Sequence, residues 1–225
     1  MSPTDVLEAV RKELRSGRWT ALCAVVATRG STPQPPGALL SVDEAAGMTG
    51  TIGGGCVEAE VRRAAFHLLQ RRRSGLLTFR LDHDDGYDDG MICGGELDVA
   101  VRVLDPRRDR DVIERAASDL RSGRETVLTF TVSASDDAGD GEKIDGSERT
   151  CSIRLEPPPT LLIAGAGHIS RVLAGFALPL GFRVCVADDR PDFANADRFP
   201  PPMRPVVGDI EETLRGFPID ASTYV

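Results

Sequence analysis

The chain lacks the features that mark several large classes of protein. No CxxC pair occurs and the five cysteines are widely spaced, which excludes a structural zinc site or a disulfide framework as the basis of the fold. No apolar run reaches the length of a membrane span, and the N-terminus has no apolar segment typical of a signal peptide. These absences predict a cytoplasmic protein that does not associate with a membrane.

Positive charge and familiar hydrolase motifs are also scarce. Arg and Lys number 27 against 35 Asp and Glu, and the net charge of −8 excludes a basic surface for nucleic acid. The longest basic run, residues 71–73, fits the charged end of a helix, where the helix dipole favours cations. There is neither a serine nucleophile elbow nor an HExxH motif. The sequence therefore offers no catalytic residue of these common types.

Hydrophobic periodicity divides the chain at a run of prolines. Ahead of this run, amphipathic helices alternate with short apolar strands, and 41% hydrophobic residues are enough for a real core. The prolines at 157–159 form a stiff connector. We therefore expect an α+β domain over residues 1–156 and a separate domain over residues 160–225.

The second domain opens with a dinucleotide-type pattern. An apolar strand at 160–164 leads into Gly165 and Gly167, then a helix, then a second apolar strand that ends in Asp188. Gly165 permits a tight turn, and Gly167 lets a pyrophosphate approach the backbone at the helix start. Asp188 can accept hydrogen bonds from the ribose hydroxyls of adenosine, and its charge disfavours a 2′-phosphate. The pattern predicts a Rossmann-like parallel α/β domain with NAD or NADP as candidate ligand.

Two points of this motif stay open at the level of sequence. His168 lies in the first helical turn, where it can contact a phosphate or simply begin the helix. The glycine turn can likewise pack a helix onto a sheet without holding a nucleotide, since fold does not imply function. Only short strands near 205–207 and 223–225 and a short helix at 211–215 follow. We therefore expect a Rossmann-like domain that is incomplete at its C-terminus.

Two glycine-rich segments of the N-terminal domain each carry a cysteine beside a glutamate. A helix start favours the thiolate form of Cys56, and exposed glycine amides can bind an anion. The segments therefore predict a site for an anionic or metal-bearing ligand, with Cys56 and Cys93 as candidate metal contacts. The alternative is that both cysteines are small buried residues beside tight turns. The candidate contacts are Gly53, Gly54, Gly55, Cys56, Glu58, Cys93, Gly94 and Gly95.

Four segments in order resemble the XdhC/CoxI family of xanthine dehydrogenase accessory proteins. They are Thr-Arg-Gly-Ser-Thr-Pro at 28–33 with Gly37, Gly-Thr-Ile-Gly-Gly-Gly at 50–55 with Glu58, Met-Ile-Cys-Gly-Gly at 91–95, and Gly-Ala-Gly-His at 165–168. The resemblance runs from about residue 21 to residue 188. One departure is Gln34, which stands where the family usually has Arg and removes a charge from that loop.

The resemblance implies a maturation chaperone rather than a catalyst. Family members bind the molybdenum cofactor (molybdopterin) transiently, assist its sulfuration, and hand it to an apo molybdenum hydroxylase such as xanthine dehydrogenase. It also implies an N-terminal α+β domain followed by a Rossmann domain. The cofactor-contacting role is carried onto the glycine, cysteine and glutamate positions named above. A cysteine desulfurase as second partner and a homodimeric state are further expectations.

Two other functions compete with this one. The dinucleotide motif alone would fit an NAD(P)-dependent oxidoreductase, but no acid or base for hydride transfer is visible beside it. It would equally fit a non-catalytic nucleotide-binding scaffold that docks a partner enzyme. Hydride transfer to a substrate would favour the first alternative, and nucleotide binding without turnover the second.

Overall fold

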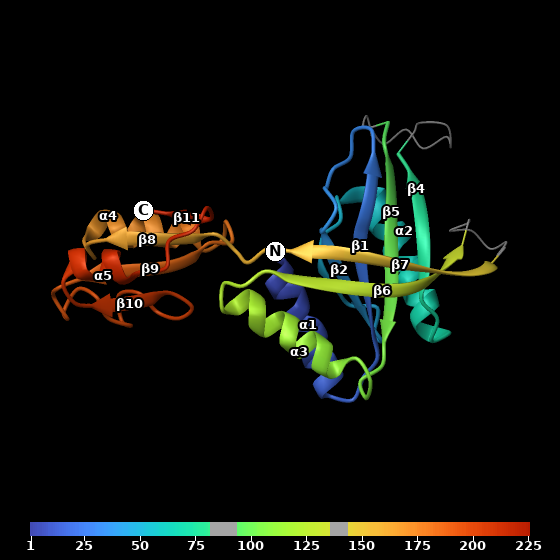
Figure 1. Cartoon of the computed structure of the whole chain (residues 1–225), viewed down its shortest axis with the longest axis horizontal. Helices are drawn as coiled ribbons and strands as arrows, with labels where there is room; N and C mark the ends of the chain where they lie inside the picture. Colours follow the sequence, from blue (N-terminus) through green and yellow to red (C-terminus); the bar gives the residue numbers. More distant parts are fainter. Residues whose placement is uncertain (82–93, 136–143) are drawn as a thin grey trace. The chain divides into compact units, whose positions relative to one another are not determined.

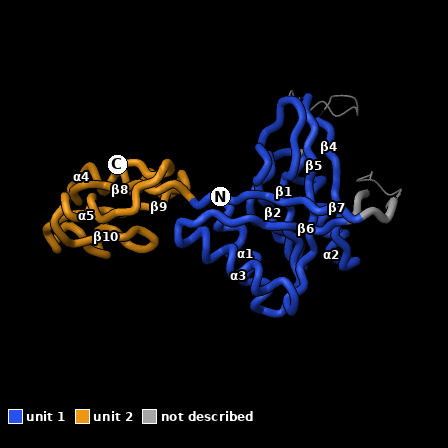
Figure 2. The backbone as a smooth tube through the Cα atoms, viewed as in Figure 1, with its two compact units in different colours: residues 1–157 blue, residues 158–225 orange. Residues whose placement is uncertain are grey.

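The computed structural model describes residues 1–81, 94–135 and 144–225. It divides into two compact units, Met1–Pro157 and Pro158–Val225, and the division falls within the proline run (Figure 2). Unit 1 combines an extended, mainly antiparallel sheet with helices, and unit 2 is built on a parallel sheet. The expected fold class, an α+β region followed by a Rossmann-like α/β region, is confirmed.

Unit 1 is a seven-stranded sheet with the strand order β3-β2-β1-β5-β4-β6-β7. Its neighbouring strands pair antiparallel except β4 with β6, which pair parallel (Figure 1). The strands are β1 (Thr20–Arg29), β2 (Leu39–Asp43), β3 (Met48–Gly50), β4 (Gly75–Arg80), β5 (Glu96–Leu104), β6 (Thr126–Ser135) and β7 (Ile144–Leu155).

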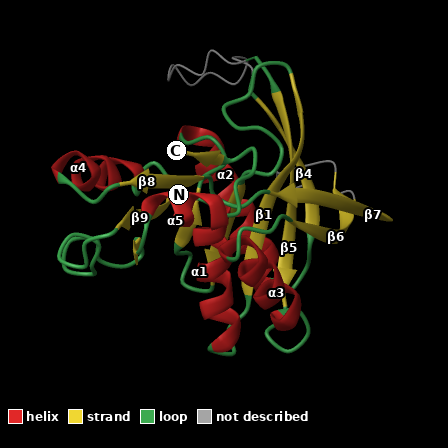
Figure 3. Cartoon of the chain, turned by 60° about the vertical axis from the view of Figure 1, so that its left-hand side comes forward, coloured by secondary structure: helices red, strands yellow, loops and turns green. Residues whose placement is uncertain are grey.

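Helices cover both faces of this sheet, because successive strand residues point to opposite sides. Leu22 and Ala24 of β1 join the core beneath α1 (Pro3–Arg15) and α3 (Arg110–Arg121), which lie side by side (Figure 3). The intervening residues Ala21 and Cys23 join the core beneath α2 (Gly55–Gln70). The strands β1, β2 and β5 are thus buried on both sides, as their apolar sequences require, whereas β4 and β6 alternate between buried and exposed residues.

The proline and aspartate early in residues 2–5 predict a helix start, and the first helix begins there. Ser2 caps it in a capping box: the Ser2 hydroxyl accepts from the Asp5 amide at 3.3 Å, and the Asp5 carboxylate accepts from the Ser2 amide at 2.8 Å. Pro3 occupies the first turn, where its missing N–H costs nothing. The apolar residues that recur at helical spacing form a fully buried stripe, which consists of Val6, Leu7, Val10 and Leu14.

Unit 2 is a four-stranded parallel sheet with the order β10-β9-β8-β11. In chain order this is 3-2-1-4, the arrangement of the first four strands of a Rossmann sheet, with the reversal of strand order beside β8. Small core residues such as Ala174 and Ala177 let α4 pack closely on the sheet. The elements are β8 (Thr160–Ala164), α4 (His168–Ala177), β9 (Arg183–Asp188), β10 (Arg204–Val207), α5 (Ile210–Gly216) and β11 (Thr223–Tyr224).

Candidate functional site

Three glycine-containing segments meet at one end of the unit 1 sheet. The first connects β1 to β2, the second connects β3 to α2, and the third is Gly94–Gly95 immediately ahead of β5. Two backbone hydrogen bonds fix the third segment to the end of β4: the Leu81 amide donates to the Gly95 carbonyl at 2.8 Å, and the Gly94 amide donates to the Leu81 carbonyl at 3.1 Å. Three motifs that are far apart in the sequence are therefore neighbours in space.

Glycine is needed at these contacts because a β-carbon would come too close to a neighbouring backbone or to the Pro33 ring. A β-carbon on Gly95 would lie 2.1 Å from the Ser31 carbonyl oxygen. One on Gly30 would lie 3.2 Å from the Gly94 carbonyl oxygen, and one on Gly53 only 2.4 Å from Cγ of Pro33. Such distances fall well inside van der Waals contact. The first segment is thus packed against both of the others.

Glu58, in the first turn of α2, holds the second segment in place. Its Oε1 accepts hydrogen bonds from the Thr51 hydroxyl and, at 3.3 Å each, from the Ile52 and Gly54 amides. Gly53 in turn donates its amide to the Thr51 hydroxyl at 3.3 Å. The carboxylate predicted as a ligand contact therefore also positions the loop, a role that sequence reasoning missed.

We expect Glu58→Ala to lower the free energy of unfolding by about 1–3 kcal/mol, since it leaves partly buried donors without an acceptor. Glu58→Gln should cost less because its amide oxygen still accepts, although the favourable charge near the helix start is lost. Urea unfolding followed by fluorescence of Trp19, which packs against the core under α2, measures both variants. Equal stability of Glu58→Ala and the parent chain would show that the carboxylate does not hold the loop.

The start of α2 faces this junction of loops without a side-chain cap. Its N-cap is Gly54 at φ +75°, which has no side chain to accept from the first amides of the helix, although the Gly54 amide itself donates to Glu58. The first amides of a helix have no partner within the helix and carry partial positive charge. Gly55 begins the helix and also has a positive φ of +65°. This helix start can therefore donate to an anion, beside the negative charge of Glu58.

Of the two candidate cysteines, only Cys56 lies among the described residues. Cys56 is the second residue of α2, so its backbone lies at the helix start. Cys93 lies outside the described residues. Among the residues described, no group of three or more His, Cys, Asp or Glu side chains is arranged to hold a metal ion. The pairing of Cys56 with Cys93 as metal contacts therefore stays a prediction.

Two other cysteines are core residues, as their apolar strands suggest. Cys23 is fully buried in β1, and burial raises the pKa of its thiol to about 12. Cys185 is buried in β9, and burial raises its thiol pKa as well. Thiols held in the neutral form are poor nucleophiles and poor metal ligands.

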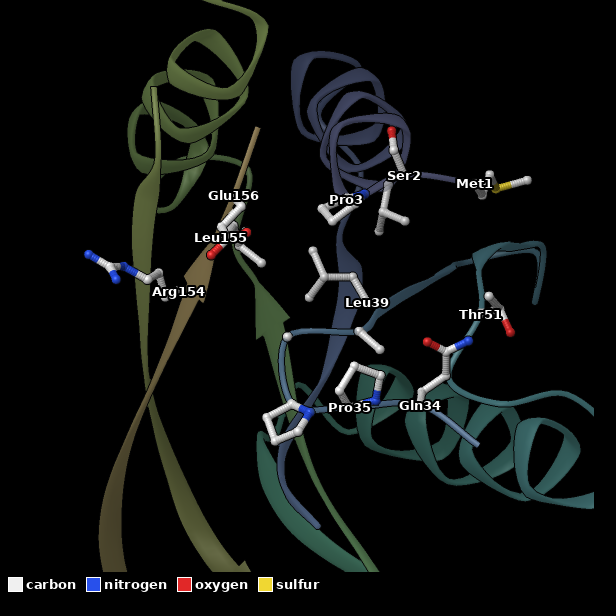
Figure 4. Close-up of a pocket in the computed structure, with 14 residues that line it drawn as sticks. Met1, Ser2, Pro3, Gln34, Pro35, Leu39, Thr51, Arg154, Leu155 and Glu156 are labelled. Carbon is white, nitrogen blue, oxygen red and sulfur yellow. The ribbon is translucent and has the colours of Figure 1, made fainter. Parts of the chain in front are cut away.

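A cavity of about 590 Å³ adjoins the first two segments. Figure 4 shows the Gln34 side chain reaching toward Thr51, while Arg154 points outward, where it pairs with Glu125 at 2.8 Å. The cavity combines apolar walls with a few polar groups, as small-molecule sites generally do. It is lined by Met1, Ser2, Pro3, Val6, Gln34, Pro35, Pro36, Gly37, Ala38, Leu39, Thr51, Arg154, Leu155 and Glu156.

Arg29 bridges the end of β1 to the start of β5. Its guanidinium lies 2.9 Å from the Glu96 carboxylate and 3.1 Å from that of Asp98. Asp98 also accepts from the Thr78 hydroxyl of β4 at 2.7 Å. Arg29 is well exposed, so solvent screens these ion pairs and each stabilises the fold only slightly. Their clearer effect is to align the strand ends beneath the loops.

Unit 2 places its glycine turn as expected, between β8 and α4. Gly165 has φ +93°, which favours glycine, and its amide donates to the Ala187 carbonyl of β9 at 2.7 Å. A β-carbon on Gly165 or Gly167 would meet no atom within 4 Å. The space beside the turn is therefore open to a ligand. His168 begins α4 and is exposed, and nothing caps the helix through a side chain.

Asp188 ends β9 directly beside this turn, but its carboxylate is already occupied. Only 1% of its side chain is exposed. Oδ2 accepts from the Ala166 amide at 2.7 Å, and both oxygens accept from the Arg190 guanidinium at 2.9 Å. The Arg190 guanidinium foremost, then the Ala166 and Arg190 amides, hold the pKa of this carboxyl far below its usual range. The sequence predicted that Asp188 lies near the turn, but not that Arg190 binds its carboxylate.

Comparison with known proteins gives the following matches. A model of the XdhC and CoxI family matches residues 13–80, and a model of the XdhC Rossmann domain matches residues 161–224. An Escherichia coli K12 protein, "Uncharacterized protein YqeB", is 27% identical over 181 residues. A probable xanthine dehydrogenase subunit of Bacillus subtilis 168 is 26% identical over 232 residues, which cover 89% of this chain and 70% of the relative.

These matches differ in how much of each relative they cover. The alignment with YqeB covers 80% of this chain but only 24% of the length of that relative. A crystal structure described as a xanthine dehydrogenase from Bacillus halodurans superimposes with a TM-score of 0.75 at 22% identity, over 99% of this chain and 73% of that one. This structural likeness establishes that the two share a fold.

In the described residues, no helix is long and apolar enough to span a membrane.

Proposed function

This chain belongs to the XdhC and CoxI family, and on that premise we propose that it is an accessory protein of a xanthine dehydrogenase-like molybdenum hydroxylase. In this role it binds the molybdenum cofactor transiently, assists its sulfuration with a cysteine desulfurase as partner, and passes it to the apo-enzyme in the cytoplasm. The protein acts as a chaperone and has no turnover of its own.

The convergence of three glycine segments at the start of α2 carries this proposal. Gly53 lies against the Pro33 ring and Gly95 against the Ser31 backbone, next to a helix start that lacks a side-chain cap. The molybdenum cofactor has a phosphate, which suits backbone amides at a helix start. A cavity of about 590 Å³ lies against two of the three segments, large enough for a small organic molecule. The donor types therefore fit the cofactor.

Different residues of this site would contact the phosphate and the metal of the cofactor. The amides at Gly55 and Cys56 would hold the phosphate, and Glu58 would keep the loop in the conformation that presents them. The bound cofactor supplies a metal that accepts thiolate sulfur, and Cys56 and Cys93 are the candidate donors. Transient binding suits a chaperone, because a site that holds its cargo too tightly cannot release it.

Titration with isolated molybdenum cofactor under anaerobic conditions tests the site. We expect the parent chain to bind and the Cys56→Ala/Cys93→Ala variant to bind at least about tenfold more weakly, since lost contacts around a metal cost 10–100-fold. Cys151→Ser, a thiol of β7 that packs against the core under α1 and α3 rather than the core under α2, is the matched control and should bind normally. Failure of the parent chain to bind, or unchanged binding by the double variant, would overturn the site.

Unit 2 supports a second activity, binding of a dinucleotide. Its 3-2-1-4 parallel sheet puts the open glycine turn at the carboxyl end of β8, beside the point where strand order reverses. Ligands of such sheets bind at that point. We propose that Gly165, Gly167 and His168 line a site for NAD or NADP, which then serves as a structural or regulatory ligand of the accessory protein. Hydride transfer to a substrate would instead favour an oxidoreductase.

A further inference from the structure

The carboxylate at the end of β9 is occupied by a neighbouring arginine rather than available to a ligand. In a dinucleotide site this acid accepts hydrogen bonds from the hydroxyls of the adenosine ribose. Here Asp188 is 1% exposed and accepts four bonds, from the Ala166 amide and from the amide, Nε and Nη2 of Arg190. A ribose hydroxyl could bind it only by displacing one of these donors.

Arg190 is held in one position and remains partly exposed. Its guanidinium lies 3.9 Å from the centre of the Phe193 ring, a distance typical of a cation–π contact. The two-pronged pair with Asp188 fixes its plane, yet 56% of the side chain is exposed. A guanidinium has five N–H donors in a rigid fork, so two bonds to Asp188 leave others for an anion.

The glycine turn is also fixed from its other side. Arg198 donates through Nη2 to the Ala166 carbonyl at 3.1 Å, while Asp188 accepts from the Ala166 amide. The buried Nε of Arg198 has no hydrogen-bond partner in the described part of the chain. Two arginines thus border the turn, and their ring contacts with Phe193 lie at 3.9 and 4.9 Å. The turn needs little rearrangement before a ligand binds.

We propose that unit 2 selects an adenosine dinucleotide that carries a 2′-phosphate, and that Arg190 is the residue that recognises this phosphate. The proposal rests on the dinucleotide site proposed above. Near the expected ribose position, the accessible member of the ion pair is a donor with full positive charge, which suits a phosphate better than a hydroxyl. It also reverses the sequence-based expectation that the charge of Asp188 would repel a 2′-phosphate, because Arg190 neutralises that charge.

Asp189 is the group that opposes this selection. Its carboxylate is 3.8 Å from Nε of Arg190, and 72% of its side chain is exposed. Solvent screens an exposed charge, so Asp189 weakens the attraction for phosphate without cancelling it. Removing its charge should therefore strengthen binding of the phosphorylated nucleotide. This gives a variant whose effect is opposite in sign to that of an Arg190 variant.

The test is calorimetric titration of the full chain with NADP⁺ and with NAD⁺. We expect NADP⁺ to bind at least about tenfold more tightly, the size of one charge-assisted hydrogen bond. Arg190→Gln should lose that preference and gain affinity for NAD⁺, since Asp188 becomes free to accept from the ribose. Asp189→Asn should tighten NADP⁺ only. Arg215→Gln, an exposed α5 residue paired with Glu211, is the control and should change neither.

The outcomes separate this inference from the dinucleotide site itself. Equal or tighter binding of NAD⁺ by the parent chain, or an unchanged preference in Arg190→Gln, overturns the role of Arg190 and leaves the dinucleotide site standing. Binding of neither nucleotide overturns the dinucleotide site and this inference with it. A melting curve of each variant checks folding, and Arg190→Lys, which keeps the charge, should retain part of the preference for NADP⁺ if Arg190→Gln melts early.

Discussion

Gly95→Ala should destabilise unit 1 by about 3 kcal/mol or more, the upper range for overpacking a tightly packed site. Its β-carbon would lie 2.1 Å from the Ser31 carbonyl oxygen and 2.9 Å from that of Arg29. Both obstacles are backbone atoms, so no side chain can rotate out of the way. Relief requires the β1–β2 connection to move away from the segment ahead of β5, which would open the junction of the three glycine segments.

Urea unfolding followed by Trp19 fluorescence measures this loss, because Trp19 reports on unit 1. Gly175→Ala in α4 of unit 2 is the control: its β-carbon would meet no atom within 4 Å, so the unfolding of unit 1 that Trp19 reports should not shift. Gly54→Ala measures the cost of backbone strain without the cost of overpacking, since its site is open but has φ +75°. A Gly95→Ala chain as stable as its parent would show that these segments do not pack as described.

The same substitution should also weaken binding of the molybdenum cofactor. If the three segments form one site, moving the first away from the third disturbs the loop that Pro33 presses against Gly53. Gly175→Ala, in the other unit, should leave that affinity unchanged. Loss of stability without loss of affinity would place the cofactor elsewhere on the protein.

Much of the fold follows from local patterns in the sequence. The buried stripe of α1 and the strand–turn–helix–strand of unit 2 were predicted, because periodicity and glycine positions are local properties. The strand β3 was not predicted, since the three residues Met48–Gly50 are too few to show a period. β7 begins at Ile144, within residues 133–148, whose polar, acidic and glycine-containing composition by itself predicts a loop; pairing with β6 is what orders this strand.

The candidate site was less predictable than the fold. The glycines were recognisable, but the contact of Gly95 with Ser31 joins residues 64 positions apart and depends on how β1 pairs with β5. The role of Glu58 could have been suspected, since an acid in the first turn of a helix commonly accepts from nearby amides. Arg190 lies two positions after Asp188, yet the sequence does not show that it pairs with both carboxylate oxygens and stacks on the Phe193 ring, since both contacts form only in the folded loop.

Asp188→Asn should destabilise unit 2 at neutral pH by about 1–3 kcal/mol, the cost of leaving a charged partner without its acceptor. Asparagine can still accept from the Ala166 amide through Oδ1, but it cannot form the two-pronged ion pair with Arg190. Asp189→Asn is a closely matched control one residue away: Asp189 is 72% exposed, so its loss should change stability by less than about 0.5 kcal/mol.

The lowered pKa of Asp188 determines how the stability difference between the two chains should change with pH. The pKa of Asp188 is lowered in the folded chain, so the unfolded chain binds the proton more readily. Its contribution is therefore complete above the unfolded value of about 3.9 and is lost as the pH falls toward the folded value. The difference in stability between the parent chain and Asp188→Asn should narrow on acidification below about pH 4. Calorimetric unfolding of both chains across this range measures it, and a constant difference would mean that Asp188 is not the titrating group.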